Sequence, residues 1–251
     1  MAEPILRVAG LSKSFGGVVA TDNLDLSVAA GEIHAVIGPN GAGKTTLVAQ
    51  LSGALRPDSG SIRFAGRDIT RLPAFARSRL GLARSFQITS IFHEFTALEN
   101  VALAVQAHDG HSFHFFADVR REQRLRATSL AALERVGLAH RADTIARHMS
   151  HGEHRQLEIA MALATEPRML LLDEPMAGMG GDESARMVDI LRSLKGRQTI
   201  LLIEHDMDAV FALADRITVL VYGRVIASGT ADQIRANDDV RIAYLGTDEA
   251  A

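Results

Sequence analysis

The sequence contains no cysteine, which excludes disulfide bonds and every metal site that depends on thiolate ligands. It also lacks an apolar run of the length that a membrane-spanning helix needs, and residues 217–222 are typical of its longest apolar stretches. The first residues show no basic start followed by an apolar stretch, so we expect no secretory signal and a cytoplasmic protein. If the protein works at a membrane, other subunits must hold it there.

Lysine is scarce, since Lys13, Lys44 and Lys195 are the only lysines among 27 basic residues. The formal net charge of −3 argues against a general nucleic-acid binder, which usually carries an excess of positive charge. Hydrophobic residues make up 47% of the 251 residues, so the chain can bury a substantial core. This length suits one domain, with or without an inserted lobe.

Short apolar runs alternate with helix-period segments, which predicts an α/β fold with a mainly parallel sheet. The expected strands of this sheet are residues 33–37, 169–172 and 199–203, followed by a pair at 217–222 and 225–227 that turns at Gly223. Two earlier runs, residues 5–8 and 24–28, predict a more exposed antiparallel sheet near the N-terminus.

The middle of the chain differs, because residues 96–165 show helix periodicity and no convincing strand. Helix patterns cover 97–107 and 120–136, and a loop is expected at 108–116. We therefore expect one domain over residues 5–246, with a helical subdomain inserted at about 88–164, and a short tail at 247–251. Asp182 and Asp206 precede later helix patterns as expected N-caps.

One glycine-rich segment follows a predicted strand and opens a predicted helix, which is the context that a phosphate-binding loop requires. Its residues are Gly38, Pro39, Asn40, Gly41, Ala42, Gly43, Lys44, Thr45 and Thr46. The glycines let backbone N–H groups turn toward phosphate oxygens, and the helix N-terminus adds partial positive charge. Lys44 is expected to reach the β- and γ-phosphates of ATP, and the Thr45 hydroxyl to bind Mg²⁺.

Acidic residues and a histidine follow two other predicted strands at the point where each strand ends. Asp173 and Glu174 follow residues 169–172, and His205 lies two residues after 199–203. Ligands of open parallel sheets bind beyond the carboxyl ends of the strands, so these groups are expected beside the phosphate loop. Asp173 is expected to contact Mg²⁺ through water in its outer shell. Glu174 is expected to polarise the attacking water, and His205 to form a hydrogen bond with the γ-phosphate.

Two further residues are weaker candidates for the same site. Gln87 follows a short apolar run and can touch Mg²⁺ or water, although taken alone it reads as a surface glutamine. Phe15 precedes two glycines and can stack on adenine, although an isolated phenylalanine more often belongs to a core.

With these residues in place, the sequence resembles the nucleotide-binding subunits of ABC transporters over nearly its whole length. The resemblance rests on five ordered motifs: Walker A at 38–46, the Q-loop at Gln87, the signature at 149–154, Walker B at 170–174 and the switch histidine at His205. It implies a P-loop NTPase core, ATP and Mg²⁺ as cofactors, and ATP hydrolysis coupled to transport.

A narrower resemblance is to the ATPase subunits of branched-chain amino-acid importers, and to the larger of the two. It is carried by residues 84–87, 157–160, 174–178, 203–207 and 243–246. It implies a second ATPase subunit, two transmembrane permease subunits and, indirectly, a periplasmic solute-binding protein, with no nucleic acid. The chain would then lie on the cytoplasmic face of the inner membrane and energise uptake of branched-chain amino acids or related small polar solutes.

The family resemblance also implies a role for the segment at Ser150, Gly152 and Glu153. Ser150 begins a predicted helix, so its hydroxyl and the nearby N–H groups form an anion site. In the family this site closes over the γ-phosphate that the partner subunit holds, so that two ATP molecules lie between two subunits.

Three positions depart from the family pattern: His151 and His154 in the signature, and Gly180, where an Asp or Asn is usual. If His154 lay near the partner's phosphates, its protonated form would favour the closed dimer. The departures also leave room for a regulatory cassette with weak ATPase activity. A related exporter of the lipopolysaccharide type is the other alternative, and genome neighbours would separate import from export.

Overall fold

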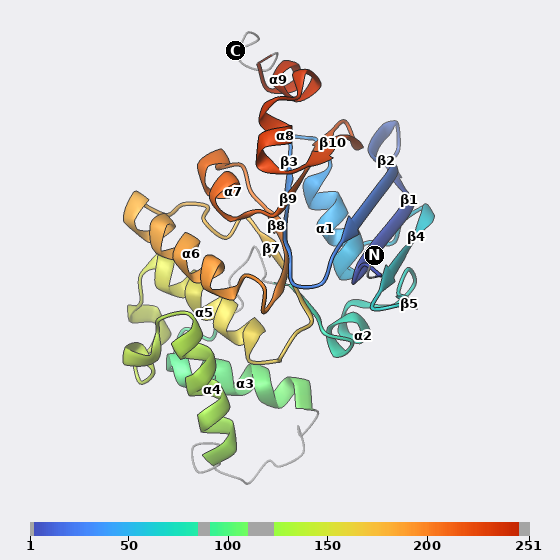
Figure 1. The fold of residues 1–251 in the computed structure, drawn as a ribbon. Helices are drawn as coiled ribbons and strands as arrows, with labels where there is room; N and C mark the ends of the chain where they lie inside the picture. The colour runs from blue at the N-terminus through green and yellow to red at the C-terminus, as the bar shows by residue number, and fades with distance from the viewer. Residues whose placement is uncertain (1–2, 85–90, 110–122, 246–251) are drawn as a thin grey trace.

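The computed structural model describes residues 3–84, 91–109 and 123–245, which form two sheets and the helices around them (Figure 1). The larger sheet has the strand order β10-β9-β3-β8-β7-β6. Its strands are β3 (Ile33–Ile37), β6 (Leu82–Arg84), β7 (Met169–Asp173), β8 (Thr199–Ile203), β9 (Arg216–Val221) and β10 (Arg224–Gly229). The strand β3 lies in the middle and pairs in parallel with β8 and β9, whereas β10 returns antiparallel to β9.

The three central strands consist almost entirely of apolar residues because both faces of this sheet are covered. Every residue of β3, β7 and β8 is buried. The helix α1 (Lys44–Ser52) lies between the two sheets, and α5, α6 and α7 cover the opposite face (Figure 1). The mainly parallel sheet and the turn at Gly223 are therefore confirmed.

The smaller sheet is antiparallel, as expected, with the order β2-β1-β4-β5. Its strands are β1 (Leu6–Phe15), β2 (Val18–Val28), β4 (Ser59–Phe64) and β5 (Arg67–Asp68). The first two are longer than the apolar runs at 5–8 and 24–28 indicated, and the sequence pattern predicted no strand at β4 or β5. Irregular register in β1 after Val8 breaks the apolar alternation, which hides the rest of the strand from a sequence pattern. The strand β4 begins at Ser59, which pairs with Ser12 of β1.

The inserted lobe is helical, as predicted. It contains α3 (Ala97–Asp109), α4 (Gln123–Arg135) and α5 (His151–Leu163), with short 3-10 turns at Ala139–Arg141 and Ala146–His148. The loop was expected to begin at residue 108, but α3 continues to Asp109. Val101, Leu133 and Leu157 are fully buried in one core that also reaches β7 and β8, so the lobe packs directly on the α/β core.

The remaining helices are α2 (Ala74–Arg79), α6 (Gly181–Leu194), α7 (Met207–Leu213), α8 (Ala231–Arg235) and α9 (Asp238–Leu245). Asp206 caps α7 as expected, because its carboxylate accepts from the amides of Asp208 and Ala209. The predicted cap at Asp182 was wrong. The cap of α6 is Gly180, and Asp182 lies in the first turn, where a carboxylate still favours the positive end of the helix.

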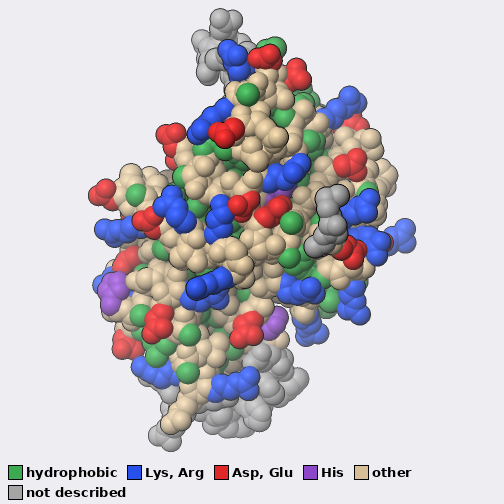
Figure 2. Space-filling view, in the orientation of Figure 1, with side chains coloured by type: hydrophobic (Ala, Val, Ile, Leu, Met, Phe, Trp, Pro, Cys, Tyr) green, Lys and Arg blue, Asp and Glu red, His purple; other side chains and the backbone are tan. Residues whose placement is uncertain are grey.

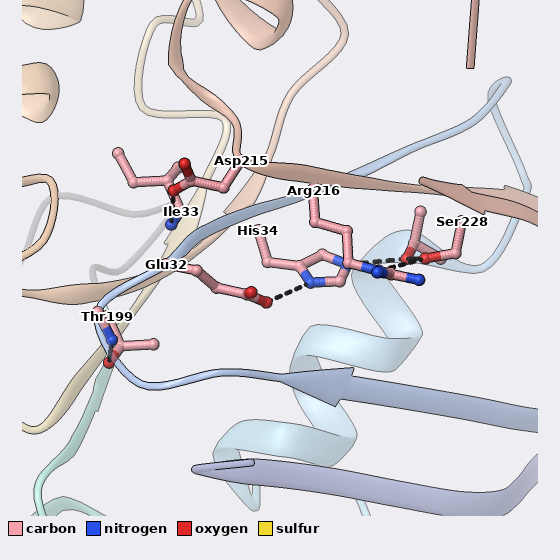
Figure 3. Close-up of polar contacts among 9 residues, drawn as sticks. Glu32, Ile33, His34, Thr199, Asp215, Arg216 and Ser228 are labelled. Atoms are coloured by element: carbon pink, nitrogen blue, oxygen red, sulfur yellow. Dashed lines mark hydrogen bonds and ion pairs between the residues drawn. The ribbon is translucent and has the colours of Figure 1, made fainter. Parts of the chain in front are cut away.

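A polar network ties the amino ends of β3 and β9 to the carboxyl end of β10, which runs antiparallel to β9 (Figure 3). The imidazole of His34 is 1% exposed and contacts a carboxylate oxygen of Glu32 at 2.9 Å and the hydroxyl of Thr218 at 2.7 Å. Thr218 lies 3.0 Å from the hydroxyl of Ser228, which also accepts from Arg216 at 3.1 Å. Both imidazole nitrogens thus have partners, so this buried histidine is fully satisfied.

The surface of the molecule mixes charges of both signs. On the face shown in Figure 2, Lys and Arg side chains alternate with Asp and Glu side chains rather than forming one basic stripe. None of the described helices has both the length and the apolar character needed to cross a bilayer.

Candidate functional site

The phosphate loop connects β3 to α1, and two of its glycines are required by close backbone contacts. At Gly38, whose φ is 157°, an added Cβ would lie 2.1 Å from the carbonyl oxygen of Leu220. At Gly43, whose φ is 101°, it would lie 2.1 Å from the carbonyl oxygen of Ala20. A residue with a side chain cannot occupy either position unless the backbone moves. The loop is therefore wedged between β9 and the smaller sheet.

Lys44 begins α1 and folds back across this loop. Its ammonium donates to the carbonyl oxygens of Gly38 at 2.6 Å and Pro39 at 3.0 Å, and the residue is only 8% exposed. Burial lowers the pKa of Lys44, while the nearby carboxylates of Glu174 and Asp173 raise it in part. The ammonium thus lies inside the curve of the loop, where the oxygens of a polyphosphate can replace the two carbonyls.

Asp173 ends β7 in a buried position next to the loop. Its carboxylate accepts from the guanidinium of Arg84 at 3.1 Å, and Arg84 also donates to the hydroxyl of Ser52 at 3.3 Å. Burial raises the pKa of Asp173, and the charge of Arg84 opposes that rise. The sequence pattern assigns Arg84 no role beyond its place in residues 84–87, which carry the family resemblance. Its contact with Asp173 could not be foreseen there, because it depends on the pairing of β6 with β7.

Glu174 follows directly and has a left-handed backbone with a φ of 49°. A residue with a Cβ in this region costs about 1–3 kcal/mol, so the surroundings must hold it. The amide of Glu174 donates to the carbonyl oxygen of Ile203 at 2.9 Å, which fixes the turn against β8. The Glu174 carboxylate lies 4.0 Å from the Nδ1 atom of His205, and both side chains remain partly open to solvent.

The N-terminus of α5 carries the segment predicted to meet a partner subunit. Ser150 is the N-cap, and its hydroxyl and the Glu153 carboxylate form a capping box. Glu153 also pairs with Arg141 at 3.0 Å, so its carboxylate is already engaged within the lobe. The Ser150 hydroxyl donates to Glu183 of α6 at 3.0 Å, and an added Cβ on Gly152 would lie 2.7 Å from the same carboxylate oxygen.

Three other predicted residues lie apart from this cluster or outside the described part. Gln87 falls among residues 85–90, which lie outside the described residues. Phe15 ends β1 with 51% exposure, and the ammonium of Lys13 lies 5.5 Å from its ring centroid. His154 contacts the carbonyl oxygen of Ala146 at 2.7 Å and stacks edge-on against His93, so its ring is engaged inside the lobe.

The structure brings together the loop at 38–46, Asp173, Glu174 and His205 at the carboxyl edge of one sheet, as the strand order requires. Among the described residues, no group of three or more His, Cys, Asp or Glu side chains can hold a metal by itself. This donor set fits Mg²⁺ bound with a nucleotide, because such sites use one or two protein oxygens and take the rest from phosphates and water.

The family model for ABC transporters matches residues 21–177, which include the loop, the capped signature helix and the acids of β7. The chain belongs to the ATP-binding subunits of ABC transporters. As an ABC ATPase it binds and hydrolyses ATP in support of transport. A second model, that of the branched-chain amino acid ATP-binding cassette transporters, matches residues 224–250.

Named relatives resemble this ABC ATPase along nearly its full length. The high-affinity branched-chain amino acid transport ATP-binding protein BraF of Pseudomonas aeruginosa is 40% identical, with 98% of this chain and 99% of the relative covered. LivG of Escherichia coli is 39% identical, with 98% and 99% covered. The daunorubicin resistance ATP-binding protein DrrA3 of Streptomyces coeruleorubidus is 42% identical, with 94% and 71% covered.

Solved structures show the same fold. A nucleotide-free ATP-binding cassette from an ABC transporter superposes with a TM-score of 0.85 at 30% identity, with 96% of this chain and 98% of that chain covered. The ADP conformation of the cassette MJ1267 gives a TM-score of 0.86 at 30% identity, with 98% and 100% covered. The P-loop NTPase core with its antiparallel sheet and helical lobe is thereby confirmed.

Proposed function

We propose that this ABC ATPase energises the import of branched-chain amino acids or related small polar solutes. The observation that carries the proposal is the match of residues 224–250 to the branched-chain family model, because this segment lies beyond the general ABC motifs. Relatives named for branched-chain amino-acid transport also cover almost the whole chain, which supports the same solute class.

In the proposed reaction, ATP lies along the loop of residues 38–46, with its adenine against Phe15. Lys44 exchanges its two carbonyl partners for phosphate oxygens, and the amides at the start of α1 donate to the same phosphates. Thr45, Gln87 and, through water, Asp173 would hold Mg²⁺, which supplies charge neutralisation on the phosphates. The contact of Arg84 with Asp173 keeps that carboxylate aimed at the loop.

Glu174 is the proposed general base, because its carboxylate is partly exposed at the open end of the site. His205 lies 4.0 Å from it and can donate to the γ-phosphate oxygens or orient the Glu174 carboxylate. The two side chains follow the neighbouring strands β7 and β8, so the pairing of these strands brings them to the same end of the sheet. A base held in this way typically contributes about 10²–10⁴-fold to a rate.

A second ATPase subunit is proposed to complete each site. Ser150 and Gly152 lie at the N-terminus of α5, whose partial positive charge, together with the Ser150 hydroxyl, would face the partner's phosphates. The Glu183 carboxylate contacts Ser150 in the single subunit, so it must move aside when a phosphate arrives. Glu153 supports this surface through the helix cap, because its amide donates to the Ser150 hydroxyl and its carboxylate accepts from the Ser150 amide.

The proposed docking site for a permease subunit is a cavity of about 260 Å³ between the α/β core and the helical lobe. Its lining includes Ser52, Ala74, Arg84, Ala104, Glu158 and Met161. Arg84 both lines this cavity and contacts Asp173, which provides a physical link between a docked permease and the Mg²⁺-binding carboxylate. The subunit would thus work peripherally, on the cytoplasmic face of the membrane where ATP is supplied.

Export is the second candidate function. It is favoured by the 42% identity to the daunorubicin resistance protein DrrA3. That relative is covered over only 71% of its length, however, whereas BraF is covered over 99%. Full-length coverage together with the C-terminal family match favours import.

The experiment that tests the proposal is purification of the native complex with its permease and solute-binding subunits, followed by reconstitution into liposomes. ATP enclosed with the ATPase should drive uptake of radiolabelled leucine, isoleucine or valine only when the binding protein is present outside. Solute movement in the opposite direction, or a complex without a solute-binding protein, would contradict import.

A further inference from the structure

Glu204 is the most deeply buried carboxylate next to the nucleotide site among the described residues, with 1% exposure. It follows β8 directly and precedes His205. One of its oxygens accepts from the amide of Met176 at 3.0 Å, and the other accepts from the amide of His205 at 3.1 Å. A single carboxylate thus joins the turn after β7 to the turn after β8.

These two turns carry the proposed general base and its histidine neighbour. Met176 lies two residues after Glu174, whose left-handed backbone needs support from its surroundings. The amide of Glu174 already bonds to Ile203, the last residue of β8. Glu204 adds a second bond, two residues further along the first segment and one residue further along the second. The strained turn is therefore attached to the other strand at two successive points.

Burying a carboxylate is energetically unfavourable, which indicates that the hydrogen bonds of Glu204 have a role. Burial raises the pKa of Glu204, so the fold disfavours its ionised form, while the donors Met176, His205 and Asp206 oppose the shift. A buried carboxylate is normally replaced at low cost by an apolar residue unless its hydrogen bonds are needed. Here the bonds hold two backbone amides that a hydrophobic side chain would leave without partners.

We propose that Glu204 is a positioning residue for ATP hydrolysis, which holds the Glu174 turn and His205 at a fixed separation. The proposal rests on the proposed roles of Glu174 and His205 in the reaction. The Glu204 carboxylate is 1% exposed and bonds to the amides of Met176 and His205, so we expect it to act through these two turns rather than on the phosphates. Its loss removes one of the two attachments between the turns and leaves the Glu174–Ile203 bond alone to hold them. A displacement of about 1 Å costs on the order of 10²-fold in rate.

The test compares the turnover number with nucleotide affinity in Glu204→Gln. The amide keeps the size of the side chain but presents an NH₂ group to one of the two backbone donors. We expect kcat for ATP hydrolysis to fall about 10- to 100-fold, while the Kd for a fluorescent ATP analogue stays within about threefold, since the phosphate loop is untouched. Glu204→Asp keeps the carboxylate on a shorter side chain, so its kcat should lie between those of the wild type and of Glu204→Gln.

Asp215→Asn is the matched control at the opposite edge of the same sheet. Asp215 also holds a backbone amide, that of Ile33 at 3.0 Å (Figure 3). It pairs with Lys195 as well. This variant should lower the melting temperature and leave kcat unchanged.

An unchanged kcat in Glu204→Gln, or an equal loss of kcat and affinity, would overturn the positioning role. If Glu204→Gln does not fold, the same comparison on Glu204→Asp decides with the same criteria. A wild-type subunit that binds ATP without hydrolysing it would instead contradict the proposed function, so the two failures are distinguishable.

Discussion

The two ends of the central strand β3 hold polar groups in opposite ways. At its amino end, His34 lies in a closed network in which both imidazole nitrogens contact neighbouring side chains (Figure 3). At its carboxyl end, Lys44 bonds to loop carbonyls, and the Glu174 and His205 side chains stand 4.0 Å apart and partly exposed. At the amino end of β3, the polar groups are saturated, because protein side chains occupy their hydrogen-bonding positions. At the carboxyl end, the contacts are exchangeable, because the groups can replace their present partners with a ligand.

The difference separates stability from chemistry. Saturated buried contacts contribute to folding and leave no group available for a ligand, because every donor and acceptor is already used. Exchangeable contacts contribute less to the folded state, but their groups can rebind to phosphates and water. We therefore expect changes at the carboxyl edge to alter activity more than stability, and changes at the amino edge to do the reverse.

At the carboxyl edge, the largest change in activity is expected from Glu174→Gln. Loss of the proposed base should reduce ATP hydrolysis by about 10²–10⁴-fold while ATP binding remains. A coupled phosphate-release assay and a nucleotide titration measure the two quantities. Undiminished turnover would remove Glu174 from the catalytic role.

Glu166→Gln is the matched control, because Glu166 has the same φ of 49° and lies before β7, at the other edge of the sheet. Its turnover should equal that of the wild type.

The next effect is expected from Lys44→Ala. Removing the ammonium should weaken nucleotide binding by about tenfold or more, since hydrogen bonds to a charged group contribute about 1.5–3 kcal/mol. Isothermal calorimetry measures the affinity, and equal binding by the variant would contradict the loop assignment. Lys195→Ala provides the comparison, because Lys195 pairs with Asp215 at the amino edge and should not affect nucleotide affinity.

A smaller effect, of the opposite kind, is expected from His34→Ala. It removes the imidazole that contacts the Glu32 carboxylate and one of the two contacts of the Thr218 hydroxyl, and it opens space in the core, so the free energy of unfolding should fall by about 2–4 kcal/mol. Urea denaturation measures this loss. The turnover number at 20 °C or below, where the variant is folded, should remain that of the wild type; a selective loss of turnover would break the division between the two edges.

The smallest effect is expected from Arg84→Gln, and it concerns pH. Burial raises the pKa of Asp173 and Arg84 opposes the rise, so removing the positive charge should raise that pKa further. In the proposed site Asp173 must be ionised to assist Mg²⁺, so activity should fail at a higher pH than in the wild type as the solution is acidified.

The profile of kcat/KM between pH 5 and 8 measures this change. Arg192→Gln, which removes a surface charge paired with Asp189, should leave the profile in place. A profile of Arg84→Gln that moved to lower pH would contradict the role of Arg84.

Much of the larger sheet could be predicted from the sequence because its strands are short, apolar and buried on both faces. The runs at 33–37 and 199–203 matched β3 and β8. The smaller sheet was harder, since β4 begins with Ser59 and Gly60, which resemble a turn, and the second half of β1 alternates poorly. Strands exposed on one face and interrupted by bulges leave a weak pattern.

The site could be predicted where a residue type and its place after a strand are sufficient. The loop at 38–46 and the acids after β7 are of this kind. The supporting contacts could not be predicted: Arg84 meets Asp173, and Glu204 meets Met176, only because distant strands pair in a given register. Contacts of this kind, which support the site residues, depend on tertiary structure and cannot be predicted from a local sequence pattern.

The backbone contact between Gly38 and Leu220 has a consequence for synthesis of the chain. The phosphate loop rests against a strand encoded about 180 residues later, and both parallel neighbours of β3 belong to the last third of the sequence. At about 5–20 residues per second, β3 waits for roughly 10–35 s before β9 leaves the ribosome. Its apolar residues stay unpaired during that interval, so nascent chains truncated before residue 216 should depend on chaperones more than longer ones.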